Sequence, residues 1–397
     1  MASASRYSVV TIVTRSHLMY AITLARSCSK WLNDCDFYLT VVDCQSDEEL
    51  SKALGDEIRD DHGNIKFLTL SDLRLPNIRI FSFQYTAFEL VCACKAYAMA
   101  ALRERGHDRI VYLDADMWIY GDFNQVWKAL DSQSILLSPH LICSLPDDAM
   151  KPQETEFLRC GTYNAGFLAI RGDETGDAFL EWFRRRMEKD CIVDVRGALF
   201  VDQKWLNLVP GLFPSVGLIR DSGFNAGHWT LSQFQITQRT ETQQTDGEFY
   251  VGDDKLSLFH FSCFLPDDPY AFQRQQNRIR LSESKPLQKL VNDYHLELAA
   301  SRRILPSPVE YGFGKLACGT IIESSWREAI RRSHPSLKKI VDPFDSRSVT
   351  DLVLLYRAIE SEATQWRADW REVSPKKSKL SKLWKKLRRK VSGWIFQ

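Results

Sequence analysis

The first third of the chain alternates short β-rich runs with helical patterns, and this alternation constrains the fold more than any other feature. The expected elements are strand Tyr7–Val13, helix His17–Trp31, strand Asp36–Asp43, strand Ile65–Leu70, helix Ala87–Arg103 and strand Arg109–Leu113. Such an order is typical of an α/β fold with a mostly parallel sheet. Ligands bind at the carboxyl ends of strands in open sheets of this kind, so the residues after Leu113 are the first candidates for a site.

Two aspartates follow the strand predicted at Arg109–Leu113. Asp114 and Asp116 are separated by one alanine, and extended geometry points their side chains to the same side. Carboxylates this close repel one another, and a divalent cation between them and a bound anion relieves the repulsion. The alternative is that one aspartate caps the turn into a helix predicted at Asn124–Leu130. The apolar strand before the pair favours the metal site.

At this motif the sequence resembles the GT-A glycosyltransferases, in particular the retaining family-eight group that includes bacterial lipopolysaccharide sugar transferases and glycogenin. The resemblance covers roughly residues 7–265. It implies a GT-A (Rossmann-like) α/β fold, with a mixed, mostly parallel sheet flanked by helices. It also implies that Asp114 and Asp116 hold Mn²⁺ or Mg²⁺ against the diphosphate of a nucleotide-sugar donor such as a UDP-sugar.

His260 is the third metal ligand that the resemblance implies. The family takes this ligand from a late His-aromatic-x-Gly motif, which residues 260–263 match except that Cys263 replaces the glycine. A buried core histidine is the alternative, because His260 would share one face of a strand predicted at Leu256–Phe261 with two leucines. A lysine that the family usually carries shortly after this motif is missing. A mixed imidazole and carboxylate site suits Mn²⁺ better than Mg²⁺.

Lys95 is the only charged residue between Glu89 and Arg103 on its predicted helix. Its side chain could reach solvent by snorkelling. The resemblance instead implies a contact with the donor or with an active-site carboxylate, since the family places a basic residue on the helix before its paired aspartates.

Two Asn-Ala-Gly segments resemble the family's donor-binding segments. The first implies donor contacts from Asn164, Ala165 and Gly166, whose amide and backbone groups can bind sugar hydroxyls; a tight turn is the alternative. The second, at 225–227, would place Asn225 in the donor pocket.

The family also carries an Asp-Gln pair that matches Asp202 and Gln203. By this resemblance Asp202 contacts the donor sugar, and Gln203 lies below the anomeric carbon in an enzyme that retains configuration. Asp202 could instead be a helix N-cap. Thr14 and Arg15 follow the first strand, with Ser16 next, and would meet the base and ribose. The family often has aspartate where Thr14 stands, which leaves the base open.

Three regions are expected along the chain: a GT-A catalytic domain at 1–285, a helical C-terminal extension at 286–374 and a basic amphipathic tail at 375–397. Residues 235–248 are predicted to form a polar surface loop, and residues 349–363 a helix. The last 22 residues hold nine Lys or Arg and no acid, with Leu and Trp at spacings of three or four. This pattern predicts docking to an anionic membrane surface, with a solvated tail or polyanion binding as alternatives.

Composition excludes other classes of protein. The formal net charge of +1 hides a tail that is basic while the remainder is acidic overall, which argues against a general nucleic-acid binder. No stretch reaches the roughly 18 apolar residues of a spanning helix, and ten scattered cysteines suggest a reducing compartment. We therefore expect a cytoplasmic protein attached peripherally to the inner face of a membrane.

Two other functions compete with a glycosyltransferase acting on a glycan or lipid-linked acceptor. A HAD-type phosphatase would use Asp114 and Asp116, with Gly252-Asp253-Asp254 as its metal motif, although Trp118 stands where that family has Thr or Val. A catalytically inactive, membrane-tethered sugar-binding module is the third possibility. Intact Asp114, Asp116 and His260 favour the enzyme.

Overall fold

The computed structural model describes residues 7–55, 65–239, 247–268, 276–306, 310–332 and 342–348, together with 350–353, 357 and 361. The chain divides into two compact units, residues 1–314 and 315–397. The domain boundaries that we predict at 285 and 374 stay predictions. The basic tail lies outside the described residues, and so does most of the helix predicted at 349–363.

A seven-stranded sheet forms the centre of the first unit. Its strands, in spatial order, are β10 (Val216–Leu218), β6 (Ile135–Pro139), β7 (Tyr163–Arg171), β4 (Arg109–Leu113), β1 (Tyr7–Val13), β2 (Cys35–Val41) and β3 (Ile65–Phe67). Neighbouring strands are parallel except at β7, which is antiparallel to β4 and β6. The predicted mixed, mostly parallel sheet is confirmed.

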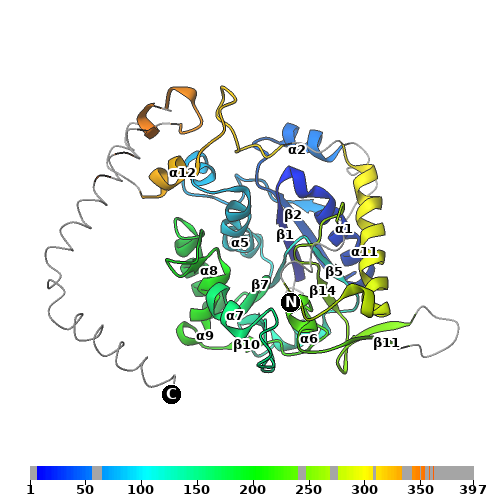
Figure 1. The fold of residues 1–397 in the computed structure, drawn as a ribbon. Coiled ribbons are helices and arrows are strands. Elements are labelled where there is room, and N and C mark those ends of the chain that lie inside the picture. Colours follow the sequence, from blue (N-terminus) through cyan, green and yellow to red (C-terminus); the bar gives the residue numbers. More distant parts are fainter. Residues whose placement is uncertain are drawn as a thin grey trace, which may run out of the picture. The chain divides into compact units, whose positions relative to one another are not determined.

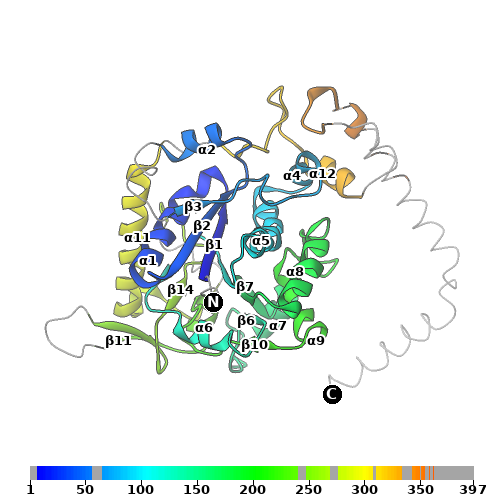
Figure 2. The ribbon, with the colours of Figure 1, turned by 180° about the vertical axis from the view of Figure 1, so that it is seen from behind.

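Helices cover both faces of this sheet (Figures 1 and 2). Helices α1 (Leu18–Trp31) and α11 (Lys285–Ile304) lie on one face, and α5 (Ala87–Glu104) and α8 (Glu174–Met187) lie on the other. The shorter helices of the first unit are α2 (Asp47–Leu54), α4 (Ile78–Phe83), α6 (Asn124–Ala129), α7 (Glu154–Cys160), α9 (Val209–Leu212), α10 (His228–Leu231), η1 (Arg15–His17), η2 (Gln203–Leu208) and η4 (Leu281–Glu283). The second unit contains α12 (Ser324–Arg331) and η6 (Ser346–Ser348).

Helix α5 is the element that carries Lys95 into the interior. It starts at a capping box, in which Thr86 and Glu89 each bond the other's backbone N–H, an arrangement that stabilises a helix by about 1 kcal/mol. The helix is buried along most of its length, because small and apolar residues occupy nearly all of its positions.

Among the described residues, no helix combines the length and apolarity needed to cross a bilayer.

A two-stranded sheet beside the main one carries His260. Strand β5 (Met117–Ile119) directly follows Asp116, and it pairs antiparallel with β14 (Leu258–His260), so that His260 lies opposite Met117. The strand predicted at Leu256–Phe261 is confirmed, though shorter. This pairing is what brings the late histidine beside the two aspartates.

The polar loop predicted at 235–248 is wrong where the structure describes it. Residues Ile236–Arg239 form β11, which pairs with β12 (Glu248–Val251), and β12 pairs with β13 (Asp254–Lys255). Polar residues suit β11 because only its first residue, Ile236, is buried. The remaining two-residue strands are β8 (Val193–Asp194) and β9 (Leu199–Phe200), which pair with each other.

Candidate active site

Three side chains converge at the carboxyl end of β4. Asp114, Asp116 and His260 each offer a ligand atom, and these atoms lie within 4.8 Å of one another. The Nε2 of His260 is 3.0 Å from Oδ1 of Asp116 and 3.9 Å from Oδ2 of Asp114. Two carboxylates and one imidazole are a donor set that suits a divalent transition metal. Neither aspartate caps α6, whose N-cap is Phe123 and makes no side-chain bond.

Opposite charge links His260 and Asp116. Burial would lower the pKa of His260, but the carboxylate of Asp116 outweighs it, and the pKa is raised above its ordinary value. Burial would raise the pKa of Asp116, and His260 reverses this, so that this pKa is lowered. His260 is therefore buried but has a charged partner, unlike a histidine in a purely apolar core.

Lys95 lies behind the metal-ligand group and does not reach solvent. Its Nζ is 2.9 Å from Oδ2 of Asp202 and 3.1 Å from Oδ1 of Asp114, and it donates to the carbonyl of Ala165 at 3.0 Å. Burial opposes the charge, but the two carboxylates raise the pKa of Lys95 well above its ordinary value. The snorkelling alternative is wrong, and the carboxylate partners suggested by the resemblance are present.

Asp202 and Gln203 lie next to this lysine. Asp202 precedes η2 but makes no capping bond, and its side chain is buried against Lys95, so the N-cap alternative is also wrong. Burial raises the pKa of Asp202 despite the nearby ammonium group. Gln203 accepts from the N–H of Ala165 at 3.3 Å and donates to the carbonyl of Cys160 at 3.2 Å. These backbone contacts fix the orientation of its amide.

The two Asn-Ala-Gly segments are buried next to the metal-ligand group: Asn164 contacts His260, and Asn225 contacts Asn164. Asn164 and Asn225 are 5% and 1% exposed, and Asn225 Nδ2 donates to Asn164 Oδ1 at 3.1 Å. Gly166 has no space for a side chain, because a Cβ there would lie 2.6 Å from Cε1 of His260. The first segment lies inside β7 and not in a tight turn.

A cavity of about 410 Å³ opens beside Asp114 and Asp116, with mostly apolar walls. Thr14, which the resemblance predicts to meet the base and ribose, is one of its lining residues. Its other lining residues were not predicted to form the site; they are Ile12, Val13, His17, Tyr20, Ala87, Phe88, Val91, Cys92, Ala115, Cys263, Phe264 and Leu265. Most of them lie at the end of β1 and just after it, in the first turns of α5 or after β14, and Ala115 follows β4. The carboxyl-end rule could have suggested the residues around the ends of β1 and β4.

Tyr112 is a further residue that the sequence analysis missed. Its hydroxyl donates to Oδ1 of Asp114 at 2.8 Å, and its ring lies 4.5 Å from Nζ of Lys95. A polar aromatic residue in a strand, two positions before an aspartate, was the available signal, because alternate strand residues share a face.

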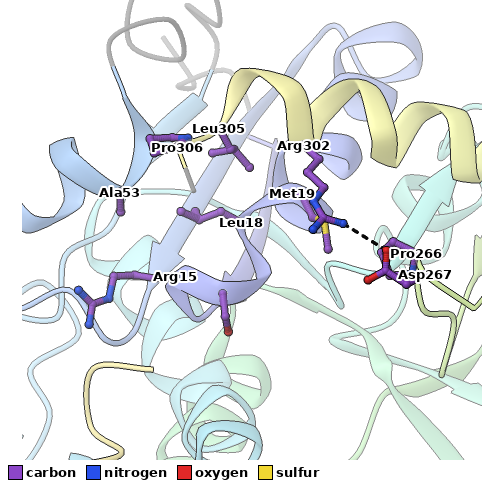
Figure 3. A pocket seen from close by; sticks show the side chains of 10 residues that line it. Arg15, Leu18, Met19, Ala53, Pro266, Asp267, Arg302, Leu305 and Pro306 are labelled. Atoms are coloured by element: carbon purple, nitrogen blue, oxygen red, sulfur yellow. Dashed lines mark hydrogen bonds and ion pairs between the residues drawn. The ribbon is translucent and has the colours of Figure 1, made fainter. Parts of the chain in front are cut away.

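Arg15 lines a different cavity, of about 350 Å³, which Figure 3 shows between the start of α1 and the end of α11. Its backbone N–H donates to Oδ1 of the buried Asp43 at 2.7 Å, and its guanidinium contacts the other carboxylate oxygen at 3.4 Å. Arg302 spans part of this cavity to reach Asp267 at 3.5 Å. Arg15 is thus not among the residues that line the cavity beside Asp114.

Comparison with known proteins gives two curated relatives and many solved structures. No family model matches the chain. YfnF of Bacillus subtilis (strain 168) is 30% identical over 160 residues, which cover 40% of this chain and 50% of YfnF. YfnD of the same strain is 21% identical over 270 residues, covering 66% and 78%. Both are described only as uncharacterized proteins, and the chain spans half the length of YfnF.

Solved glycosyltransferases match the structure over most of its length. The galactosyltransferase LgtC, crystallised with donor and acceptor sugar analogues, is 18% identical, with a TM-score of 0.41 and coverage of 76% of this chain and 98% of LgtC. GlyE of Streptococcus pneumoniae TIGR4 is 14% identical, with a TM-score of 0.41 and coverage of 77% and 65%. Mouse xyloside xylosyltransferase 1 is 13% identical, with a TM-score of 0.37 and coverage of 65% and 98%. The mixed, mostly parallel sheet between two layers of helices is the arrangement that the GT-A resemblance predicts. A fold does not by itself define an activity, which has to be argued from the site.

Proposed function

We propose that the chain is a metal-dependent glycosyltransferase of the hexosyltransferase type, using a nucleotide-sugar donor such as a UDP-sugar. The convergence of Asp114, Asp116 and His260 beside a largely apolar cavity is the observation that carries this proposal. Carboxylates that line a cavity suit a cation that would bind the diphosphate of a donor there. Apolar walls with a few polar groups suit a nucleoside.

Each side chain of the site has its own role in this proposal. Asp114, Asp116 and His260 would hold Mn²⁺, or Mg²⁺, which supplies Lewis-acid stabilisation of the leaving diphosphate when bound. Lys95 neutralises the carboxylates of Asp114 and Asp202, which would otherwise repel each other. Asp202 contacts the donor sugar in this proposal.

Gln203 supports transfer with retention of configuration. Its two backbone contacts hold an uncharged amide beside Ala165. An amide is a poor base for deprotonating an acceptor hydroxyl, in contrast to the carboxylate expected of an inverting enzyme. Assignment of the anomeric configuration of the product by NMR tests this: an inverted product would show that Gln203 does not have this role.

A thermal-shift panel of nucleotide sugars with and without Mn²⁺ tests the proposed function. Ligand that binds the native state at 100 times its Kd stabilises that state by about 2.7 kcal/mol. We expect a shift that requires both Mn²⁺ and a nucleotide sugar. Asp116→Ala should fold normally but lose the shift and turnover, whereas Asp147→Ala, at an exposed aspartate, should keep both. Normal turnover in Asp116→Ala would refute the metal site.

The competing phosphatase hypothesis finds no support in the geometry. Gly252 and Asp253 form the turn between β12 and β13, and Asp254 is the first residue of β13. There Asp254 accepts from the backbone and hydroxyl of Ser222, while Asp253 pairs with Arg239. Neither aspartate belongs to the group formed by Asp114, Asp116 and His260. An inactive sugar-binding module would show neither hydrolysis of any nucleotide sugar in the panel nor metal-dependent binding of a nucleotide.

A saccharide or lipid-linked acceptor at a membrane surface is the further part of this proposal. The nine cations of residues 376–397 support it, because each cation near an anionic leaflet contributes about 1 kcal/mol of binding. We further propose a cytoplasmic location at the inner face of a membrane, with the same basic tail as its support.

A further inference from the structure

We infer that Asn164 is a positioning residue for His260, one that keeps a proton on Nδ1 and so leaves Nε2 as the nitrogen that binds the metal. This inference rests on the proposed metal site. The buried juxtaposition of Nδ1 of His260 and Oδ1 of Asn164, at 3.2 Å, is its main observation.

The identity of the facing atom on Asn164 follows from its neighbours. The backbone N–H of Gly166 donates to this atom at 3.1 Å. A backbone N–H can only donate, so the atom must be the carbonyl oxygen of the amide and not its nitrogen. Nδ2 of Asn225 also donates to it, at 3.1 Å.

An oxygen that only accepts fixes the proton on the imidazole. Nδ1 of His260 can contact Oδ1 of Asn164 favourably only as an N–H donor, because two lone pairs would repel each other. Its Nε2 faces Asp116 at 3.0 Å and Asp114 at 3.9 Å. With the proton kept on Nδ1, a deprotonated Nε2 would present its lone pair to a cation held by the two carboxylates.

The surroundings of Asn164 hold this arrangement in place. Nδ2 of Asn164 contacts Nε2 of His140 at 3.2 Å, and Asn225 is in turn bonded to Ser138 at 3.0 Å. The ring of Trp229 meets that of His260 edge to face, with centroids 5.2 Å apart. Both ends of the Asn164 amide are therefore used inside the protein, and the residue is only 5% exposed.

This role differs from the donor contact that the resemblance implies for Asn164. A sugar hydroxyl would have to displace one of three contacts on Oδ1 that are already made. Residues that orient a metal-bound histidine through its second nitrogen typically change metal affinity by about 10- to 100-fold when mutated. The inference therefore predicts a defect in metal binding that is present without any donor.

Mn²⁺ binding to the donor-free protein tests the inference. Affinity is measured from the EPR signal of free Mn²⁺, and a coordinated imidazole is detected by ¹⁴N modulation in pulsed EPR. We expect Asn164→Leu to bind Mn²⁺ about 10- to 100-fold more weakly and to lose the ¹⁴N modulation. Asn164→Asp keeps an accepting oxygen and should retain both. His260→Gln defines the spectrum without the imidazole ligand.

A matched control is Asn207→Leu. The Oδ1 of Asn207 accepts from the N–H and hydroxyl of Thr162, at 3.0 and 3.1 Å, near the start of β7. Asn207 thus holds the residue that precedes β7, the strand that contains Asn164, but neither of these hydrogen bonds reaches His260. Its loss should leave Mn²⁺ affinity and the ¹⁴N modulation unchanged.

The results distinguish a failure of this inference from a failure of the proposed function. If Asn164→Leu binds Mn²⁺ like the wild type and keeps the ¹⁴N modulation, the inference is overturned while the metal site stands. If the wild type binds no Mn²⁺, the proposed function fails and the inference fails with it. If the variant does not fold, a measurement on the wild type alone tests the inference. NMR of the Zn²⁺-loaded, ¹⁵N-histidine-labelled protein should find the His260 proton on Nδ1. A proton on Nε2 would overturn the inference.

Discussion

Lys95 and Asp202 form an ion pair in the interior, with Nζ and Oδ2 2.9 Å apart and both side chains only 2% exposed. Removing two charges from water is costly, and the cost is offset only when further polar contacts satisfy both groups. Lys95 finds these contacts in Asp114 and in the carbonyl of Ala165. One ammonium group thus links α5 to the end of β4, to β7 and to the start of η2.

Lys95→Met should destabilise the protein by about 3–5 kcal/mol, because it leaves Asp114 and Asp202 without their shared cation. Unfolding in urea measures the loss. Lys128→Met, at an exposed lysine, should stay within about 0.5 kcal/mol of the wild type. Adding Asp202→Leu to Lys95→Met should restore part of the stability but not turnover. A single variant as stable as the wild type would contradict a buried, charged Lys95.

The sequence predicted the central elements closely because their signals are local. Strands Tyr7–Val13 and Arg109–Leu113 match the structure, and the helix predicted at Ala87–Arg103 differs by one residue. Apolar periodicity is strong in each of these segments. Strand β11 was missed because its last three residues are polar, and only its pairing with β12 makes this segment a strand.

The site could be predicted as a set of residue types, but not as a geometry. An isolated cation on an apolar helix showed that Lys95 needs a partner, yet Asp202 as that partner depends on how η2 lies against α5. Asn164 was assigned by resemblance to the donor, whereas its burial beneath His260 depends on the pairing of β5 with β14. Contacts between distant segments follow from packing that periodicity does not encode.

Mn²⁺ affinity should increase with pH. Burial would lower the pKa of His260, but Asp116 raises it above its ordinary value, so the imidazole of the metal-free protein keeps its second proton to a higher pH than an ordinary histidine does. A metal ligand must lose its proton. Below the raised pKa, the dissociation constant should therefore fall by up to about tenfold for each unit that the pH rises, and level off above it. Calorimetric titration across pH measures this slope. His260→Gln should bind weakly with a flatter profile, and an equally steep profile in that variant would assign the proton to another group.

Cys263 should report on donor binding. Its exposed thiol lines the cavity beside Asp114 and Asp116, so a bound nucleotide with Mn²⁺ should slow alkylation there by about tenfold or more at saturation. Exposed Cys143 does not line this cavity and provides the internal control, with peptide mass spectrometry as the measurement. Equal protection of both cysteines, or of neither, would count against a donor in this cavity.

The backbone of Cys263 suggests a variant for the same experiment. Its φ is +65°, in the left-handed region that favours glycine, where the family motif has glycine. Cys263→Gly should be stabilised by about 1 kcal/mol, because glycine adopts this conformation without the Cβ penalty. It should keep turnover and lose the label. A loss of stability would show that the packing of the thiol stabilises the protein more than relief of the left-handed backbone conformation does.

Deleting residues 376–397 should release the protein from anionic vesicles while preserving transfer to a soluble acceptor analogue. The nine cations and the Leu/Trp stripe of this segment lie far in sequence from every residue assigned to the site, so the tail should govern location and not chemistry. Binding of the full chain should weaken as salt rises, because screening acts on exposed charges. Flotation at low and high salt, run beside a soluble-acceptor assay, separates the two roles.

Substituting Trp384 and Trp394 by serine should weaken flotation at high salt more than at low salt, since the apolar contribution is the part that salt does not screen. If the truncated protein still floats with the vesicles, or loses activity on the soluble acceptor, the tail is not a detachable anchor.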